Sequence, residues 1–456
     1  MKRTSAQLSS VQTTSSNPYF VSMSKILLDQ FKITEGQKIW LRFGSERVQV
    51  TCKKSPHEEA MIQIPTKLGI AHCFPIKTAT YPLSYNIDLQ ELRLGPIIAL
   101  LTEKTPNDTR LFGNVTDFSR ELYTLCAEQQ LPFYLFSLDD IDNHRIHGYV
   151  LNLNGIQKVT FPLPDVIYNR ISSRNIERSD VCRSFFEQCQ DLGIAYFNDH
   201  FLSKWETHCI LVELDTVAAY LPETLLYDGS DSVGKLIDKH SMVFLKPIHG
   251  REGKGIVRIQ THEADRVQLD LSSETTPLKS SLSKSTAIKL FEDLLPKNEY
   301  IVQQGIPLLD FEGGKVDFRI LCNRNEHGNW RISSTVARVS SQERFVSNLS
   351  QGAKTYTSME MLEHFFDKKT SQQLLRTLYE VAINVSDCIS HHAGGIFGEL
   401  GIDVGIDTNG HPWIIEINTK PSKQYLTGNR TSEIRPSARG VFQFARFLSE
   451  STFSSV

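Results

Sequence analysis

Residues 394–422 have the sequence GGIFGELGIDVGIDTNGHPWIIEINTKPS, and this stretch decides how the rest of the chain is interpreted. Asn409 and Gly410 separate two apolar-rich runs, which is the strongest short-range signal for a β-hairpin with a two-residue loop. With such a loop, Thr408 faces His411 across the two strands. The loop thereby sets the pairing of the residues further along the hairpin.

In this pairing, Asp403 lies directly opposite Glu416, and Gly401 lies opposite Asn418. Strand alternation places Glu416 and Asn418 on the same face. The other face then receives three apolar side chains, Trp413, Ile415 and Ile417. Opposed side chains have Cβ atoms about 5 Å apart. At that distance two carboxylates repel each other, and one becomes neutral unless a cation lies between them.

Hard oxygen ligands such as those of Asp403, Glu416 and Asn418 suit a magnesium ion that holds a substrate phosphate. The alternative is a solvated hairpin face with scattered acids, which is the usual position of charged residues. We favour the metal site because Glu416 is flanked by isoleucines in a strand with the pattern of a buried one. The pairing depends on the loop, since a bulge, or Pro412, would shift it by one residue.

The composition is that of an ordinary soluble globular protein, with 40% apolar and 22% charged residues. A length of 456 residues predicts about three domains. The net charge is only −3 and no Lys/Arg block occurs, so we expect no nucleic acid partner. No apolar run approaches the roughly 18 residues that cross a bilayer, so we expect no membrane span.

The N-terminus and the cysteines indicate a cytoplasmic localisation. Residues 1–20 have two basic residues but no apolar core behind them, so they form no secretory signal. We expect residues 1–19 to be a flexible Ser/Thr-rich tail. The eight cysteines include no CxxC pair, and most lie in apolar periodic segments. This pattern predicts reduced thiols and no structural zinc.

Two domains are predicted between this tail and residue 201. Residues 20–92 contain short alternating runs broken by glycines, which predicts a small β-rich domain without evident chemistry. In residues 93–200, strands alternate with helices, which predicts a parallel sheet covered on both faces. The strands are expected at residues 96–101, 133–136 and 165–170, and one helix is expected to end at Gly193.

The third region begins near residue 201 and has a lysine in an apolar strand, followed by a glycine-rich loop. Lys246 needs an anionic partner, such as a triphosphate, or its pKa must fall. Gly250, Gly253 and Gly255 let backbone amides approach phosphate oxygens closely. The loop is no P-loop, because the GK[ST] signature is missing. A plain hairpin would use the same glycines, so that alternative stays open for the loop alone.

Two arginines, Arg319 and Arg338, lie in later strands among apolar neighbours, and these strands are expected to pair around a turn. An arginine in such a position usually forms a salt bridge, here with acids such as Asp317 or Glu399. The other interpretation is a clamp for an anion, for which a guanidinium offers a fixed fork of donors.

The order of these features resembles the ATP-grasp superfamily over residues 204–422: strand lysine, glycine loop, hinge strand, strand arginine, then Asp … Glu-x-Asn. In that family two α+β lobes hold ATP between them, so the resemblance implies an ATP-grasp fold with ATP and Mg²⁺ as cofactors. It implies nucleotide contacts from Lys204, Lys246, Gly250, Gly253, Gly255, Gln303, Gln304, Ile306 and Asp310.

The same resemblance implies individual roles. Lys246 would contact the α- and β-phosphates, the hinge that begins at Gln303 would hold adenine through its backbone, and Asp310 would take the place of the ribose-binding acid. Gln303 and Gln304 stand where the family more often has an acid, which departs from its pattern. The implied metal ligands are Asp403, Glu416 and Asn418, and the implied catalytic residues near the γ-phosphate are Arg319, Arg338 and Asn348.

More narrowly, the whole chain is similar to the YheC/YheD-type endospore coat-associated proteins of spore-forming bacilli. The similarity rests on LGPIIALLTE, PDVIYNRI, FLKPIHGREGKGI, VDFRIL and EINTKPS. It implies a mixed α+β and α/β architecture in which a Rossmann-like α/β domain precedes the ATP-grasp domain. The expected division is a tail at 1–19, a β-rich domain at 20–92, an α/β domain at 93–200, and an ATP-grasp domain at 201–456 with lobes at about 201–305 and 306–450.

The resemblance implies an ATP- and magnesium-dependent ligase that activates a carboxylate as an acyl-phosphate for attack by an amine, linked to the bacterial endospore coat or envelope. The expected partners are a small-molecule or peptide carboxylate, an amine acceptor and spore coat proteins. Two alternatives stay open: a non-catalytic ATP-binding assembly protein of the coat, and an ATP-dependent phosphotransferase. Intact Lys246, Asp403, Glu416 and Asn418 favour the ligase, since a purely structural descendant need not keep a charged pair that destabilises an empty hairpin.

Overall fold

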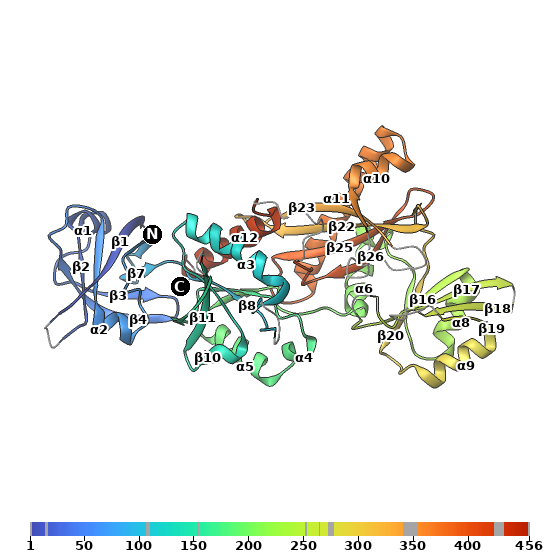
Figure 1. Cartoon of the computed structure of the whole chain (residues 1–456), viewed down its shortest axis with the longest axis horizontal. Coiled ribbons are helices and arrows are strands. Elements are labelled where there is room, and N and C mark those ends of the chain that lie inside the picture. The colour runs from blue at the N-terminus through green and yellow to red at the C-terminus, as the bar shows by residue number, and fades with distance from the viewer. Residues whose placement is uncertain are drawn as a thin grey trace. The chain divides into compact units, whose positions relative to one another are not determined.

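The computed structural model describes residues 2–13, 17–105, 110–152, 155–250, 253–263, 265–271, 278–340, 354–423 and 433–454. The chain forms two compact units (Figure 1). The first unit comprises residues 1–199, 324–328 and 433–456, and the second comprises residues 200–323 and 329–432. Among the described residues, no helix combines the length and the apolar character that crossing a membrane requires.

The first unit begins with a closed β-barrel. Its strands run in the order β1 (Lys2–Val11), β5 (Met61–Pro65), β2 (Phe20–Met23), β4 (Glu46–Lys54), β3 (Lys38–Phe43), β7 (Glu91–Leu94) and β6 (Ala79–Asn86). Two short helices, α1 (Lys25–Phe31) and α2 (Thr66–Ala71), accompany them. The β-rich character expected for residues 20–92 is thus present.

The flexible tail expected at residues 1–19 is wrong for residues 2–11, which form β1. This strand pairs with both β5 and β6 and so takes part in closing the barrel. Ala6 and Leu8 are buried in the barrel core, whereas Ser5 and Gln7, which alternate with them, are exposed. Alternation of buried and exposed side chains is the pattern of a strand with one outward face, so a polar composition that suggested disorder also fits a strand.

A seven-stranded sheet follows in the same unit. Its order is β10 (Ile141–Asp142), β11 (Arg145–Asn152), β9 (Phe133–Phe136), β8 (Ile98–Leu101), β13 (Val166–Asn169) and β14 (Ala195–Phe197), and β12 (Gly155–Pro162) pairs with β11. The strands β9, β8, β13 and β14 are parallel. Three short helical segments lie between the larger elements: Gly113–Val115, Leu138–Asp140 and α4 (Arg174–Glu177).

Helices cover both faces of this sheet. Helices α3 (Thr116–Glu128) and α12 (Pro436–Ser454) share one apolar cluster with Ile98, Leu100 and their neighbours. Helix α5 (Asp180–Asp191) packs into the cluster on the other face and ends before Gly193, which has φ +66°. The prediction of a parallel sheet core covered on both faces is confirmed, whereas the antiparallel β10–β11–β12 extension was not expected.

Helix α12 corrects the expected domain division. Residues 201–456 were expected to form the ATP-grasp domain, but α12 belongs to the first unit. Its buried Ala438, Val441 and Phe444 lie in the cluster that contains α3. An apolar helical stripe predicts burial but not the partner, so the sequence pattern could not assign this helix to its unit.

The second unit contains two six-stranded sheets. The first has the order β15 (Thr224–Leu226), β20 (Tyr300–Gln304), β16 (Met242–Pro247), β17 (Val257–Glu263), β18 (Arg266–Leu271) and β19 (Leu278–Ser283). Helices α8 (Ser230–Lys239) and α9 (Lys284–Leu294) pack on one face of it. Val267 and Leu269 of β18 are buried in the same apolar cluster as these helices.

The second sheet carries the hairpin. Its order is β24 (Lys354–Thr357), β23 (Trp330–Val339), β22 (Gly314–Arg324), β25 (Glu399–Ile406) and β26 (Pro412–Asn418), and β21 (Asp310–Phe311) pairs with β22. Helices α6 (Lys204–Val212), α7 (Asp215–Ala218), α10 (Ser358–Phe365) and α11 (Lys368–His392) accompany it. The buried positions of α11, including Leu378, Val381 and Val385, pack with the apolar face of this sheet.

Candidate functional site

The hairpin pairs Asp403 with Glu416 and Gly401 with Asn418, as the sequence predicts. The predicted two-residue loop is nevertheless wrong. The backbone N–H of Asp407 donates to the carbonyl of His411 (3.0 Å), so three residues form the loop. This shifts the pairing near the loop by one residue, and an irregularity between Asp403 and Val404 restores it at Asp403. The pairing is therefore right although the loop is not.

The longer loop is built by the carboxylate of Asp407. Its Oδ1 accepts hydrogen bonds from the backbone N–H groups of Asn409 and His411, both at 2.9 Å, and its Oδ2 accepts from the indole of Trp413 at 3.0 Å. Burial alone would raise the pKa of Asp407, but these hydrogen bonds lower it below its usual value. An aspartate that bonds to the backbone two residues on is a known turn former, and this signal was missed.

The β-bulge also corrects the expected strand faces. Ile415 was expected on the face opposite Glu416, but both residues line the same pocket. Ile414, which is buried, packs into the core of the unit in its place. A bulge adds one residue to one strand and so reverses the alternation beyond it.

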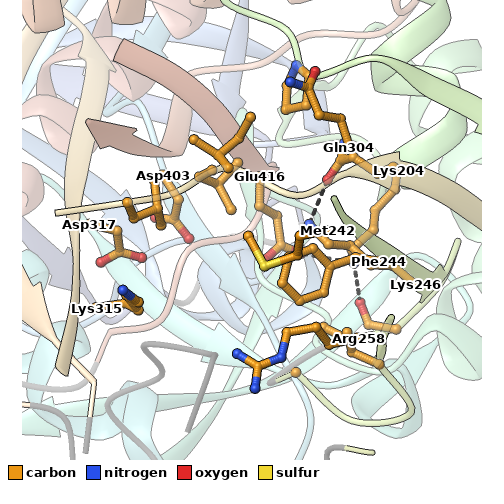
Figure 2. Close-up of a pocket in the computed structure, with 18 of the residues that line it drawn as sticks. Lys204, Met242, Phe244, Lys246, Arg258, Gln304, Lys315, Asp317, Asp403 and Glu416 are labelled. Carbon is orange, nitrogen blue, oxygen red and sulfur yellow. Dashed lines mark hydrogen bonds and ion pairs between the residues drawn. The ribbon is translucent and has the colours of Figure 1, made fainter. Parts of the chain in front are cut away.

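This pocket lies within the second unit and is lined by residues of both its sheets (Figure 2). The described residues that line it include six cationic side chains, those of Lys204, Lys246, Lys254, Arg258, Lys315 and Arg338. They include three carboxylates, those of Asp317, Asp403 and Glu416. A concave surface with such an excess of positive charge favours a polyanionic ligand.

Lys246 extends from β16 into this pocket. Its Nζ donates to the side-chain oxygen of Gln303 at 2.6 Å. The pKa of Lys246 is lowered to about 8, chiefly by burial and also by the charge of Lys204, while the charge of Glu416 opposes this. Of the two alternatives expected from the sequence, the second applies here, because the hydrogen-bond partner is a neutral amide and the pKa has fallen.

Lys204 begins α6, where Ser203 and Glu206 form a capping box. Its backbone N–H donates to the carbonyl of Ile248 (3.0 Å), and its Nζ donates to the carbonyl of Gly250 (2.7 Å). The same Nζ lies 3.0 Å from a carboxylate oxygen of Glu416. One lysine thus joins the start of the glycine loop to one of the predicted metal ligands.

The glycine loop connects β16 to β17, and Gly250 and Gly253 line the pocket. Gly253 and Gly255 have φ values of +72° and +71°, which side chains rarely adopt. A Cβ atom at Gly255 would also lie 3.2 Å from the ring of Pro247. Gly255 therefore serves the conformation of the loop and is not itself among the lining residues.

A row of charged residues crosses the second sheet. Arg319 in β22 pairs with Asp403 in β25, which pairs with Glu416 in β26. The guanidinium of Arg319 donates to both oxygens of Asp403, with its Nη2 at 2.8 Å. Arg338 also lies 3.1 Å from Asp403 and donates to both oxygens of Asp317 at 2.7 and 2.5 Å.

The proton affinities in this row follow from these contacts. Burial alone would raise the pKa of Asp403, but the charges of Arg319 and Arg338 lower it below its usual value. Burial alone would lower the pKa of Arg338, but the charges of Asp317 and Asp403 raise it. Asp403 and Arg338 are therefore both charged near neutral pH.

The arginines take the salt bridges that the sequence offered as an alternative to an anion clamp. Arg338 pairs with Asp317, as that alternative stated, whereas Arg319 pairs with Asp403, and Glu399 is paired instead with Lys423. Arg338 lines the pocket and Arg319 does not. The third residue predicted to be catalytic, Asn348, lies outside the described residues.

The residues of the predicted metal site fit a magnesium ion. Asp403 and Glu416 are directly opposed hard oxygen ligands. Asn418 follows on the same strand but does not line the pocket, and its buried Nδ2 has no hydrogen-bond partner among the described residues. The described part of the chain holds no cluster of three or more His, Cys, Asp or Glu side chains placed for a metal. The two carboxylates would thus be the protein ligands of the ion, and oxygens of phosphate and water would complete its coordination.

The hinge after β20 also reaches the pocket, where Gln303, Gln304 and Ile306 are lining residues. The Gln303 amide donates to the hydroxyl of Thr224 (3.0 Å) as well as accepting from Lys246, so its orientation is fixed. Asp310 does not line the pocket, but it lies 3.3 Å from Lys315, which does.

Several lining residues were missed by the sequence reasoning. Met242 and Phe244 alternate with Lys246 along β16 and so share its face. That alternation was a signal available in the sequence. Arg258 and Lys315 gave no comparable signal, because each lies in a different strand and only the pairing of strands brings it to the pocket.

Comparison with known proteins gives one family match. The family described as YheC/D like ATP-grasp matches residues 193–448, which is more than half of the chain. The chain is 25% identical over 419 residues to the endospore coat-associated protein YheD of Bacillus subtilis, covering 91% of each chain. It is 24% identical over 315 residues to YheC of the same organism, covering 68% of this chain and 86% of that protein.

Among solved structures, the chain is similar to D-alanyl-alanine synthetase A of Vibrio cholerae, with 12% identity and a TM-score of 0.47 over 79% of this chain and 99% of that one. It is also similar to the D-cycloserine synthetase DcsG, with 14% identity and a TM-score of 0.44 over 78% of this chain and 99% of that one.

Proposed function

The chain belongs to the YheC/D-like ATP-grasp family, and on that premise we propose that it is an ATP- and magnesium-dependent ligase. It activates a carboxylate as an acyl-phosphate, which an amine then attacks. The observation that carries this proposal is the pocket of the second unit, in which cationic side chains surround the opposed carboxylates of Asp403 and Glu416.

The cations of the pocket suit the triphosphate of ATP. Among the described residues, the hydrogen-bond acceptor of Lys246 is a neutral amide, and the lysine's pKa of about 8 reflects mainly the cost of burying the ammonium. A phosphate oxygen would provide a negative charge and accept a charge-assisted hydrogen bond. Lys204 contacts both Gly250 of the glycine loop and Glu416, so its ammonium is placed to contact phosphates that bind between them.

Asp403 and Glu416 would hold magnesium, which would neutralise the charge that develops on the transferring phosphoryl group. Without metal, the two carboxylates are neutralised by Lys204 and by the two arginines. Metal binding would therefore free Lys204 to turn toward phosphate oxygens, while Arg338 keeps its hydrogen bonds to Asp317. The site thus pairs its two acids with the chain's own cations before any ligand enters.

The reaction has two steps. A carboxylate oxygen of the substrate attacks the γ-phosphorus of ATP, and ADP leaves. The amine nitrogen then attacks the acyl carbon, the C–O bond to phosphate breaks, and the amine loses a proton. Arg338, which lines the pocket, stabilises the anionic oxygens in these steps through a fixed donor geometry, and Asp317 orients it. Arg319 does not line the pocket and acts through Asp403, which it holds in place.

We also propose a link to the bacterial endospore coat or envelope, which rests on the names of the two Bacillus subtilis relatives. The substrates would then be small-molecule or peptide carboxylates and amines of that structure. The same names favour the second candidate, an ATP-binding assembly protein of the coat without turnover.

The test uses purified protein with magnesium, ATP and pools of amino acids and spore-envelope peptides whose carboxylates carry ¹⁸O. A ligase transfers ¹⁸O from the carboxylate to released phosphate and forms a new amide, both visible by mass spectrometry. A phosphotransferase leaves a phosphorylated product and releases no phosphate. Binding of ATP without either product supports the assembly protein, and absence of ATP binding rejects every version of the proposal.

A further inference from the structure

One row of paired residues forms part of the pocket wall. Gln303 in β20 pairs with Phe244 in β16, Phe244 pairs with Arg258 in β17, and Arg258 pairs with Asp270 in β18. Directly opposed residues of an antiparallel sheet project from the same face. Gln303, Phe244 and Arg258 all line the pocket, and Figure 2 places Arg258 beside Phe244.

Asp270 fixes the orientation of Arg258. Both Nε and Nη2 of the guanidinium donate to Oδ2 of Asp270, at 2.8 and 2.5 Å. The Asp270 side chain is only 1% exposed, and its other oxygen accepts from the amide of Gln268 at 3.1 Å. A planar guanidinium with one edge bound in this way has a defined direction. A buried ion pair by itself adds little stability compared with apolar residues of similar size, so it is weak evidence for a purely structural role.

The position of Arg258 along the sheet suggests which part of a nucleotide it meets. Lys246 is two residues closer to the glycine loop than Phe244, a step of about 7 Å along a strand. Arg258 is opposite Phe244, on the strand that leaves the glycine loop. A base at the hinge and phosphates beneath the glycine loop would place the sugar and the α-phosphate near this row.

We propose that Arg258 binds the α-phosphate of the nucleotide and that Asp270 is its positioning residue. This inference rests on the proposed function, because it assumes that ATP binds in this pocket. It adds that Arg258, which lies outside the glycine loop, makes the pocket bind 5′-phosphorylated nucleosides more tightly than nucleosides. Lys246 and Lys204 then serve the remaining phosphates.

The test is calorimetric titration of the full-length protein with ATP, AMP and adenosine in the presence of magnesium. For Arg258→Met we expect the affinities for ATP and AMP to fall about tenfold or more, because a charge-assisted hydrogen bond is lost. The affinity for adenosine stays unchanged. Arg258→Lys keeps the charge but not the fork and recovers part of the loss, and Asp270→Asn shows the same pattern with a smaller loss.

The matched control is Lys284→Met, which removes the ion pair between α9 and Asp238 in the same unit but outside the pocket lining. It should leave all three affinities unchanged. Equal losses for AMP and adenosine in Arg258→Met would overturn the inference, as would unchanged affinities in a folded variant. If the wild-type protein binds no ATP, the proposed function itself fails. If the wild type binds ATP but its affinity does not depend on Arg258, only this inference fails, so the two failures are distinguishable.

Discussion

Lys246 is the residue whose protonation the pocket controls most directly. Its pKa of about 8 means that it loses its proton within the range in which enzymes are assayed. We therefore expect ATP affinity to fall as pH rises from about 7 to 9, since only the charged form binds phosphate strongly. Calorimetry across this range measures the fall. Lys246→Met should bind ATP weakly with little pH dependence, and a wild-type affinity that does not change with pH contradicts this.

Lys204 competes with a metal ion for Glu416, because its Nζ already lies 3.0 Å from that carboxylate. In the absence of nucleotide, Lys204→Met should therefore bind Mn²⁺ more tightly than the wild type does. In the presence of nucleotide it should bind ATP more weakly, because a phosphate partner is lost. Titration with Mn²⁺ followed by paramagnetic resonance measures the first effect, and Glu416→Gln is the control that should abolish metal binding. A Lys204→Met protein with weaker metal binding would contradict the competition.

At the scale of single residues, the sequence predicts the pocket residues whose charge is unusual for the apolar strands in which they lie. A lysine in an apolar strand and an acid between isoleucines were visible without a structure, and both line the pocket. The pairing of Arg319 with Asp403 was not predicted, because it depends on which strand lies beside β25. Long-range strand order leaves no local signal in a sequence.

At the scale of the element, the hairpin depends on Asp407 more than on Asn409 and Gly410. Asp407→Ala removes the acceptor of three hydrogen bonds in a buried position. We expect this to lower the free energy of unfolding by roughly 1–3 kcal/mol, the cost of leaving buried donors unsatisfied. Urea denaturation measures it. Thr408→Ala, at an exposed position of the same loop, should change little, and equal effects of the two substitutions would contradict the role of Asp407.

The hairpin also shows why register prediction is fragile. The Asn-Gly signal located the turn but gave the wrong loop length, and the bulge compensated by one residue. The pairing of Asp403 with Glu416 was therefore predicted correctly, while the face of Ile415 was not. Both deviations depend on side chains that satisfy local backbone groups, which hydrophobic alternation does not detect.

At the scale of the whole molecule, the division into units follows contacts between distant segments. Residues 2–11 and α12 join the first unit from opposite ends of the sequence, and neither assignment was predicted. The alternation of strands and helices in residues 93–200 was sufficient to predict the covered parallel sheet. Packing between distant segments could not be predicted from the sequence. An amphipathic pattern indicates that one face of an element is buried, but it does not identify the element that covers this face.

Deletion of residues 2–11 tests the barrel. Removing β1 exposes the edges of β5 and β6 and opens the barrel core around Leu8. We expect the thermal unfolding of the first unit to shift downward, while ATP binding in the second unit persists. Leu8→Asp should have the same effect without changing chain length. An unchanged melting profile in both variants would restore the flexible tail that the sequence suggested.

Magnesium-dependent binding of ATP to the pocket of the second unit is the central claim, and calorimetry of the wild type beside Lys246→Ala tests it most directly. We predict that the wild type binds ATP only weakly until magnesium is added. The substitution should weaken binding by about 1.5–3 kcal/mol, because it removes a charge-assisted contact. Absence of ATP binding by the wild type, or equal affinity in the two proteins, would contradict the account.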